Sequence, residues 1–188
     1  MRVIAGSRRS LPLKTLPGPD IRPTTDKIKE TLFNMMNPYL PGSRFLDLFA
    51  GSGAIGIEAL SRGAAEAWFI ESARPAIRVI EENVAFPKFT EEARIVASDV
   101  FSWLMRNEKA EQPFDLIFMD PPYGKGYEKK ALSLLRESAL LNDESIIIVE
   151  ALKDEDFSYL ESFGFEMIKQ KVYRTNQHVW LRKAGTHE

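Results

Sequence analysis

The sequence predicts an α/β fold in which a mostly parallel sheet carries helices on both faces. From Arg44 onward, short apolar and β-branched runs alternate with helical patterns, as in successive βα units. Near the C-terminus, two strand-like runs flank a tight turn at Arg174-Thr175-Asn176, which predicts an antiparallel hairpin. With 188 residues, 44% of them hydrophobic, the chain fits one folded domain with a substantial core.

The N-terminal region predicts a small β-hairpin followed by one helix. The β-like runs 2–6 and 11–16 flank a basic turn, and a break rich in proline and glycine follows at 17–20. Thr24 or Thr25 can then cap a helix whose apolar residues recur at helical spacing.

The remaining elements follow in chain order. Strands are predicted where apolar and β-branched residues form short runs, at 44–49, 67–70, 94–97, 114–119, 145–149, 166–173 and 177–182. Helices are predicted where apolar residues recur at helical spacing, at 54–61, 73–85, 101–106, 127–138 and 155–162. The expected sheet therefore has seven strands, the last of them antiparallel.

Positive charge gathers near the N-terminus, although the net charge of the chain is −2. The basic residues of segment 1–29 outnumber its two acidic ones, Asp20 and Asp26, and they are Arg2, Arg8, Arg9, Lys14, Arg22, Lys27 and Lys29. Such an arm can engage phosphates, although a solvated tail would have the same composition. We therefore predict a basic N-terminal unit, residues 1–37, on the side of a phosphate-bearing ligand, and one compact domain, residues 38–188.

The composition excludes several classes of protein. Without cysteine, the chain has no disulfide, no thiolate metal site and no cysteine nucleophile, which excludes methylation of pyrimidine C5 through a covalent cysteine adduct. No metal site is predicted. No apolar run is long enough to span a membrane and no signal-peptide core is present, so a cytoplasmic location is expected.

The segment that begins at Phe45 contains a nucleotide-binding pattern. Gly51, Gly53 and Gly56 form G-x-G-x-x-G between a predicted strand and a predicted helix, which is the context that this motif requires. Small residues let a ligand approach the backbone, and the amides at the helix start face that ligand. A tight turn without a ligand is the alternative.

Asp47 favours a cationic ligand over a dinucleotide. Its carboxylate would repel a pyrophosphate but attract the ammonium group of S-adenosylmethionine. Glu71, twenty residues after Gly51, could accept the ribose hydroxyls of either ligand. Asp99 could accept from the adenine amino group while Val100 packs against the ring, although Asp99 could equally be the N-cap of the next helix.

The segment Asp120-Pro121-Pro122-Tyr123 follows a buried strand and predicts a site for a planar amino group. The prolines lack N–H donors, so the chain cannot continue a ladder and nearby carbonyls lose strand partners. Carbonyls, a carboxylate and a flat ring together suit a base with an exocyclic NH2; a rigid turn with a surface tyrosine is the alternative. Because strand order in an open α/β sheet reverses between the first and fourth strands, this segment and the loop that contains Gly51 and Gly53, here called the glycine loop, should face one crevice.

Together, these segments resemble the Rossmann-like S-adenosylmethionine-dependent methyltransferases, and among them the RsmD family of bacterial 16S ribosomal RNA guanine-N2 methyltransferases. The resemblance rests on five segments in family order and spacing: Arg2-Val-Ile-Ala-Gly6, Arg22-Pro-Thr-Thr-Asp26, Leu32-Phe-Asn34, Asp47-Leu-Phe-Ala-Gly-Ser-Gly53 and Asp120-Pro-Pro-Tyr123. It covers nearly the whole chain, although the tail after Lys183 has no clear counterpart in the family.

The resemblance implies a class I methyltransferase fold, S-adenosylmethionine as cofactor, and 16S rRNA as partner, within the small ribosomal subunit or its precursor. The catalytic residues expected are Asp120, Pro121, Pro122 and Tyr123. The cofactor-binding residues expected are Asp47, Phe49, Ala50, Gly51, Ser52, Gly53, Glu71, Asp99 and Val100. The residues expected to contact RNA are Arg2, Arg8, Arg9, Arg22, Thr24 and Thr25.

The expected reaction is direct methyl transfer to the base nitrogen. Its N–H groups would donate to Asp120 and the Pro121 carbonyl, which localises the nitrogen lone pair, while Tyr123 stacks on the base. The base has to be unpaired or flipped out.

Other functions stay open on the residues alone. Adenine N6 in RNA or DNA is an alternative target, because the motif does not distinguish amino groups. An NAD-dependent oxidoreductase would leave Asp47 and Asp120 unexplained, and a non-catalytic RNA-binding module would show no methyl transfer. His178 and His187 are interpreted as a strand residue and a tail residue rather than as proton donors.

Overall fold

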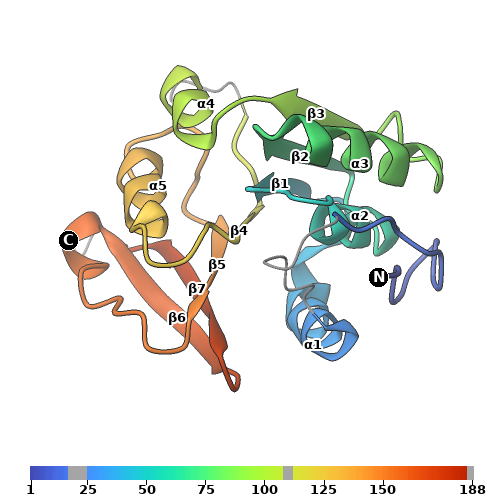
Figure 1. Cartoon of the computed structure of the whole chain (residues 1–188). Helices are drawn as coiled ribbons and strands as arrows, with labels where there is room; N and C mark the ends of the chain where they lie inside the picture. Colours follow the sequence, from blue (N-terminus) through green and yellow to red (C-terminus); the bar gives the residue numbers. More distant parts are fainter. Residues whose placement is uncertain (17–24, 108–111, 186–188) are drawn as a thin grey trace.

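The computed structural model describes residues 1–16, 25–107 and 112–185. Its strands are β1 (Arg44–Leu48), β2 (Glu66–Glu71), β3 (Ala93–Ala97), β4 (Leu116–Met119), β5 (Ile146–Leu152), β6 (Phe165–Val172) and β7 (Asn176–Lys183). Its helices are α1 (Asp26–Met36), α2 (Ala54–Ser61), α3 (Arg74–Ala85), α4 (Val100–Arg106), α5 (Tyr127–Leu135) and the 3-10 turns η1 (Asn37–Tyr39) and η2 (Glu161–Phe163). The strands form one seven-stranded sheet in the order β3-β2-β1-β4-β5-β7-β6 (Figure 1).

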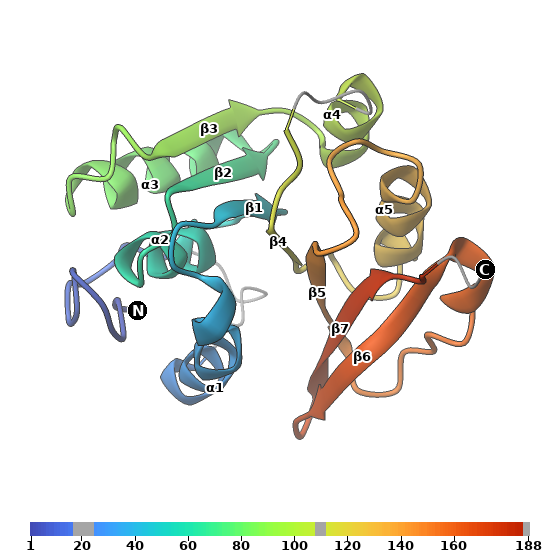
Figure 2. The same ribbon diagram turned by 180° about the vertical axis from the view of Figure 1, so that it is seen from behind.

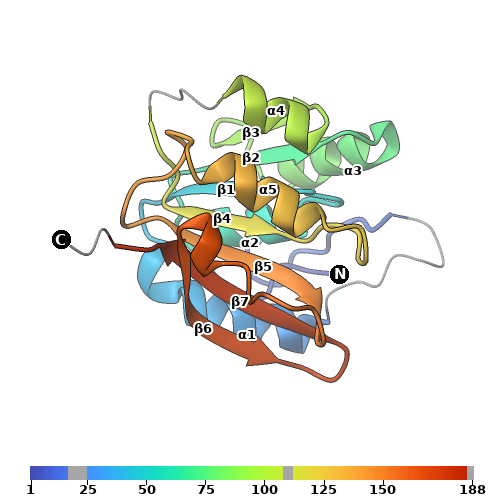
Figure 3. The same ribbon diagram turned by 90° about the vertical axis from the view of Figure 1, so that its left-hand side faces the viewer.

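Helices cover both faces of this sheet. α1, α2 and α3 lie on one face, and α4 and α5 lie on the other, as the rear view also shows (Figure 2). Seen from the side, α5 lies in front of the sheet and α1 behind it (Figure 3). Each face therefore has its own apolar cluster, one around Phe45 and Phe69 and the other around Leu46 and Ile117. Neighbouring residues of β1 point to opposite faces, which is the period of a strand.

The central strands are buried on both faces, as parallel strands between helices have to be. All four residues of β4 are buried, and β1 to β5 pair in parallel. β7 pairs antiparallel with both β5 and β6. The predicted fold class, a mostly parallel sheet with a returning antiparallel hairpin, is confirmed.

Two predicted elements take another form. The predicted helix 155–162 is wrong, because Asp156 accepts hydrogen bonds from the Ser158 N–H and hydroxyl and turns the chain there; only the short η2 follows. The predicted N-terminal hairpin contains an antiparallel loop with a single isolated bridge, Arg2 with Pro12, instead of two strands. Pro12 has no N–H with which to extend a ladder.

The N-terminal residues are packed onto the rest of the chain. Val3, Leu32 and Phe33 are fully buried in the same cluster as Phe45 and Ile57. The division at residue 37 is therefore not a division of the core, and two functional units stay a prediction. Within the described segments, no helix is long and apolar enough to cross a membrane.

Candidate functional site

The two predicted motifs leave adjacent strands. β1 pairs with β2 on one side and β4 on the other, so the strand order reverses at β1 and β4. The last pair of the β1–β4 ladder is Leu48 with Met119, and the glycine loop and Asp120 follow directly. Ligands of open α/β sheets bind at this kind of switch point, outside the carboxyl ends of the strands.

Two cavities adjoin this switch point. A small cavity of about 210 Å³ is lined by the glycine loop together with Asp47 and Asp120. A large cavity of about 830 Å³ is lined by Glu71, Asp99 and Asp120, among others. Phe49 and Asp120 line both cavities, so the small and the large cavity meet at these two residues. The structure thus brings Asp47 and Asp120 to one space.

The glycine loop has an unusual backbone. Phe49, Gly51 and Gly53 have φ of +60°, +56° and +76°, in the left-handed region. A bulky residue such as Phe49 rarely adopts this conformation, so the surrounding contacts have to hold it. Its ring stacks on Tyr127 at 6.2 Å between centroids and meets Phe101 edge-on at 6.0 Å. The loop is therefore fixed by aromatic packing against α4 and α5.

Glycine is required at position 56 for packing and is favoured at position 51 by the left-handed backbone. A Cβ on Gly56 would lie 2.3 Å from Cε1 of Phe69, so only glycine lets α2 lie this close to β2. A Cβ on Gly51 would meet no atom within 4 Å, because that side of the residue is open space. Gly51 and its neighbours Ala50 and Ser52 line the small cavity, so the bare backbone there can be approached by a ligand.

Glu71 holds the glycine loop from the end of β2. Its Oε2 accepts from the N–H of Gly51 at 2.9 Å, and its Oε1 accepts from the N–H groups of Ser72 and Ala73, both at 2.8 Å. A carboxylate has about four lone-pair sites, so three such bonds still leave capacity for another donor. Glu71 faces the large cavity with that capacity.

Asp47 is a buried carboxyl group inside β1. Its Oδ2 accepts from the N–H of Gly56 at 3.0 Å, which joins the strand to the first turn of α2. Burial raises the pKa of Asp47 well above its ordinary value, and the negative charge of Glu71 raises that pKa further. A cation in the small cavity would relieve this cost.

Asp99 and Val100 lie at the start of α4. Asp99 Oδ1 accepts from the N–H of Ser102 at 2.9 Å, which confirms the alternative interpretation of Asp99 as an N-cap. Both residues also line the large cavity. Capping engages Oδ1, and a carboxylate has a second oxygen, so a ligand contact is compatible with this role.

The segment Asp120–Tyr123 directly follows β4 and forms one wall of the large cavity. Asp120 is exposed at the surface of the cavities, but the protein packed around its carboxyl group raises the pKa of Asp120 well above its ordinary value, and the nearby charges of Glu150 and Asp47 raise that pKa further. Tyr123 is partly exposed, and its hydroxyl donates to Oε1 of Glu150 at 3.3 Å. All four residues of the motif line this cavity.

The sequence interpretation missed a polar cluster behind Tyr123. Glu150 in β5 is buried, and it pairs in register with His178 of β7, which is fully buried. Asn176 Nδ2 also donates to Glu150, at 2.8 Å. One signal was available, because Glu150 is an acid that directly follows the most apolar strand segment of the chain. The sequence pattern alone places His178 as an ordinary strand residue.

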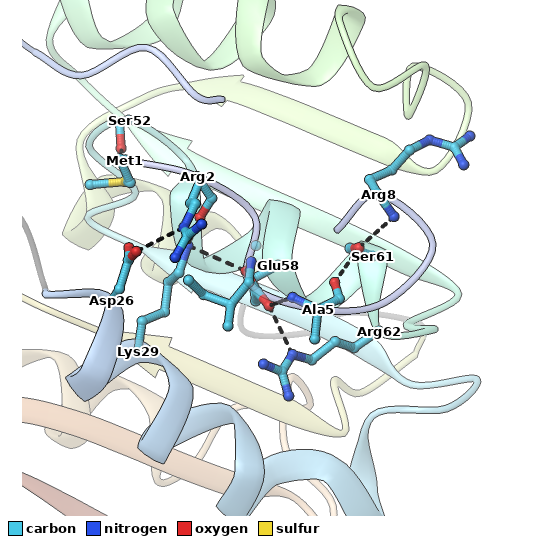
Figure 4. A network of polar contacts seen from close by, with 12 residues as sticks. Met1, Arg2, Ala5, Arg8, Asp26, Lys29, Ser52, Glu58, Ser61 and Arg62 are labelled. Carbon is cyan, nitrogen blue, oxygen red and sulfur yellow. Dashed lines mark hydrogen bonds and ion pairs between the residues drawn. The ribbon is translucent and has the colours of Figure 1, made fainter. Parts of the chain in front are cut away.

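The N-terminal arm, residues 1–16, is held by a buried acid in α2. Glu58 accepts from the N–H of Ile4 at 2.8 Å and of Ala5 at 3.0 Å, and it pairs with Arg62 and Lys29 at 2.9 and 3.3 Å. Figure 4 shows these side chains converging on Glu58.

The residues predicted to contact RNA lie in different places. Arg8 lies at the far end of the arm, where its backbone N–H donates to the Ser61 hydroxyl (Figure 4). Its guanidinium donates to the carbonyl of Pro87. Ser61 ends α2, so this turn lies about 12 Å, the length of eight helical residues, from the glycine loop. Arg9 belongs to the same turn and is exposed. The structure does not bring Arg8 and Arg9 to the cavities.

Of the other residues predicted to contact RNA, some lie closer to the cavities, and some lie outside the residues that the structure describes. Arg2 pairs with Asp26 at 2.9 Å on the surface. Thr25 caps α1 through the N–H of Ile28, at 3.3 Å, and both residues line the large cavity. Arg22 and Thr24 lie outside the described residues.

A metal centre is not indicated by the described side chains. Within residues 1–16, 25–107 and 112–185, no group of three or more His, Cys, Asp or Glu side chains is placed to hold a metal ion.

Comparisons with known proteins identify the family. The family model described as Conserved hypothetical protein 95 matches residues 1–182. The protein of Escherichia coli (strain K12) named Ribosomal RNA small subunit methyltransferase D is 40% identical over 151 residues, 80% of this chain and 74% of that protein. The Haemophilus influenzae protein of the same name is 35% identical over 172 residues, 92% of this chain and 88% of its own. The solved structure of yhhF from Escherichia coli has a TM-score of 0.86 to this chain at 34% identity, with 98% of both chains covered. The chain therefore belongs to the RsmD family of ribosomal RNA methyltransferases.

Proposed function

We propose that this protein transfers a methyl group from S-adenosylmethionine to the exocyclic N2 amino group of a guanine in 16S ribosomal RNA. The observation that carries this proposal is the meeting of Asp47 and Asp120 at one cavity, between the glycine loop and the segment that ends at Tyr123. The family supports the chemistry, since its members in two bacteria are named as methyltransferases of small-subunit rRNA.

The residues present fit S-adenosylmethionine. The small cavity offers open backbone at Gly51 and the buried carboxyl group of Asp47, which suit the positively charged amino acid end of this cofactor. Glu71, Asp99 and Val100 line the large cavity, where ribose hydroxyls and an adenine ring would find acceptors and an apolar contact. When bound, the cofactor supplies an electrophilic methyl group on a sulfonium.

The chain's own residues prepare the base nitrogen. Asp120 and Pro121 follow the last ladder pair of β4, so the carboxylate and the Pro121 carbonyl can accept the two N–H groups of an exocyclic amine. These acceptors localise the nitrogen lone pair and stabilise the positive charge that develops on nitrogen. Tyr123 supplies a ring on which a flipped-out base can stack. The raised pKa of Asp120 makes its carboxylate a stronger base for the proton that leaves.

The RNA approaches from the side of α1 and the turn between β6 and β7. Thr25 and Ile28 of α1 and Thr175 and Asn176 of that turn line the large cavity beside the proposed base site. The small ribosomal subunit or its precursor is the expected source of this RNA, as the names of the family members suggest.

A substitution of Asp120 tests the proposal. We expect Asp120→Ala to lower the rate of methyl transfer by about 10²–10³-fold, the usual effect of removing one preorganised group, with the affinity for S-adenosylmethionine nearly unchanged. Asp143→Ala, an exposed acid outside both cavities, is the matched control. Mass analysis of nucleosides from treated 16S rRNA identifies the methylated base. Methylated adenine in place of N2-methylguanine, or a near wild-type rate for Asp120→Ala, would contradict the proposal.

A further inference from the structure

The buried cluster behind Tyr123 fixes one carboxylate beside the proposed base site. Oε1 of Glu150 accepts from Asn176 Nδ2 at 2.8 Å and from the Tyr123 hydroxyl at 3.3 Å, and Oε2 bonds with Nε2 of His178 at 2.9 Å. The partners come from two elements, the loop after β4 and strand β7. Both carboxylate oxygens are thus engaged, and the side chain of Glu150 has a set orientation.

His178 is itself held from its other side. Its Nδ1 lies 3.4 Å from the hydroxyl of Tyr173, and its ring meets those of Tyr173 and Phe118 edge-on. A tyrosine hydroxyl that donates to Nδ1 leaves the proton of the imidazole on Nε2, where it points at Glu150. Donors of Tyr123, Asn176 and His178 thus converge on the carboxylate of Glu150, which is buried together with His178.

Several charged groups therefore surround Asp120. Glu150 of β5 lines the large cavity together with Asp120, and Asp47 of β1 lines the small cavity together with Asp120; the negative charges of both raise the pKa of Asp120. Lys29 of α1 lines the small cavity together with Asp47 and Asp120, and Glu71 acts on Asp47 from β2. Of these groups, Glu150 is the one that also bonds Tyr123.

We propose that Glu150, oriented by His178 and Asn176, is a positioning residue of methyl transfer that sets the Tyr123 ring and places a negative charge beside Asp120. This inference rests on the proposed function. Methyl transfer forms a nitrogen–carbon bond and breaks the carbon–sulfur bond of the donor, so one proton has to leave the amine. Asp120 accepts this proton and releases it to water in the large cavity, and the charge of Glu150 makes the acceptance more favourable.

The pH profile of Glu150→Gln distinguishes this role from a structural one. Methyl transfer needs ionised Asp120, so the rate falls on the acid side of the pKa of that group. A neighbouring negative charge raises this pKa, and its removal lowers it. We expect the acid limb of log kcat for Glu150→Gln to move to lower pH by about half a unit or more, and the plateau to fall about 3–10-fold because Asp120 becomes a weaker base.

Two further substitutions serve as controls. Glu150→Asp keeps the charge but withdraws it from Tyr123, so the acid limb should stay near its wild-type position while kcat falls. Glu128→Gln makes the same chemical change at an equally buried acid of α5 that lines neither cavity, and it should leave the acid limb in place.

The outcomes separate this inference from the proposed function. A wild-type protein without methyl transfer to 16S rRNA refutes the proposed function. Suppose instead that the wild type is active and that Glu150→Gln loses rate or stability. If the acid limb of its log kcat profile then stays at the wild-type pH, the role of Glu150 alone is refuted. If Glu150→Gln fails to fold, Tyr123→Phe decides: it keeps the ring and loses the bond to Glu150, and we expect kcat to fall about 3–10-fold with KM unchanged. A wild-type kcat would then overturn the inference.

Discussion

The substitution Glu58→Gln should severely destabilise the protein through a single buried charge. Glu58 is fully buried in α2, where it bonds two backbone N–H groups of the N-terminal arm and pairs with Arg62 and Lys29. Glutamine keeps the size of the side chain and one acceptor oxygen. It removes the negative charge that compensates the buried ammonium group of Lys29, whose side chain is 1% exposed.

The magnitude follows from the state of Lys29. Removing one partner of a buried ion pair costs about 3–5 kcal/mol, because the other charge stays uncompensated. The cost has a ceiling, since Lys29 can lose its proton instead. That loss costs about 1.4 kcal/mol for each unit between pH 7 and the usual pKa of lysine, or about 5 kcal/mol in all. We therefore expect Glu58→Gln to lower the free energy of unfolding by about 3–5 kcal/mol and Tm by about 6–20 °C.

Urea unfolding followed by circular dichroism at pH 7 and pH 9 measures how much unfolding free energy Glu58→Gln loses. The comparison of the two pH values tests whether the charge of Lys29 is the cause. Burial lowers the pKa of Lys29 in the folded protein, and the charge of Glu58 opposes this effect. In Glu58→Gln the charge of Glu58 no longer opposes this effect. At pH values between the lowered pKa of Lys29 in the folded protein and the usual lysine pKa, the unfolded chain therefore binds more protons than the folded chain. The free energy of unfolding of the variant then rises with pH, by up to about 1.4 kcal/mol per pH unit. The difference in this free energy between wild type and variant therefore becomes smaller at pH 9.

The matched control is Glu137→Gln, which removes the acid of the exposed Arg136–Glu137 pair. Exposed pairs contribute about 0–1 kcal/mol, so the control should stay close to the wild type. A loss below about 1 kcal/mol in Glu58→Gln, or a gap that does not narrow at pH 9, would refute the reasoning.

Two further predictions concern the site and the arm. Asp47→Asn should raise Tm at pH 7 and weaken S-adenosylmethionine binding in calorimetry. Because burial raises the pKa of Asp47 in the folded state, the ionised carboxylate destabilises the protein at pH values above the usual titration range of aspartate. Asparagine removes that charge and keeps the oxygen that accepts from the N–H of Gly56. An unchanged affinity would remove Asp47 from the cofactor site. Arg9→Ala should leave Tm unchanged and reduce the slope of log K for RNA against log salt by about 0.7–0.9, the effect of one lost phosphate contact. Arg8→Ala, which also loses the bond to Pro87, should lower Tm as well; an unchanged slope in both variants would exclude the turn from RNA binding.

The sequence was sufficient where a site depends on local structure or on a general rule of topology. The glycine loop and Asp47 belong to one strand, loop and helix, so their pattern is continuous along the chain. Asp120 is distant in sequence, but the reversal of strand order in α/β sheets places it beside that loop.

Other features depend on register and packing, which the sequence does not show directly. Glu150 meets His178 only because β7 returns antiparallel to β5 in one register, and the sequence pattern of a strand does not show that register. The position of Arg8 depends on where the arm meets Ser61, 53 residues away. The prediction of a helix at 155–162 is wrong although the apolar residues there have helical spacing. The side chain of Asp156 accepts from the backbone N–H of Ser158 and so competes with the hydrogen bonds of a helix.

The contact between Met1 and Ser52 has a practical consequence. The sulfur of Met1 lies 3.9 Å from the hydroxyl of Ser52, and Met1 lines the small cavity. Any peptide fused to the amino group of Met1 would therefore start at the rim of that cavity, where it could obstruct ligand entry. Affinity tags for biochemical work should be attached after β7, at the other end of the chain, and a fusion ahead of Met1 should be cleaved before binding is measured.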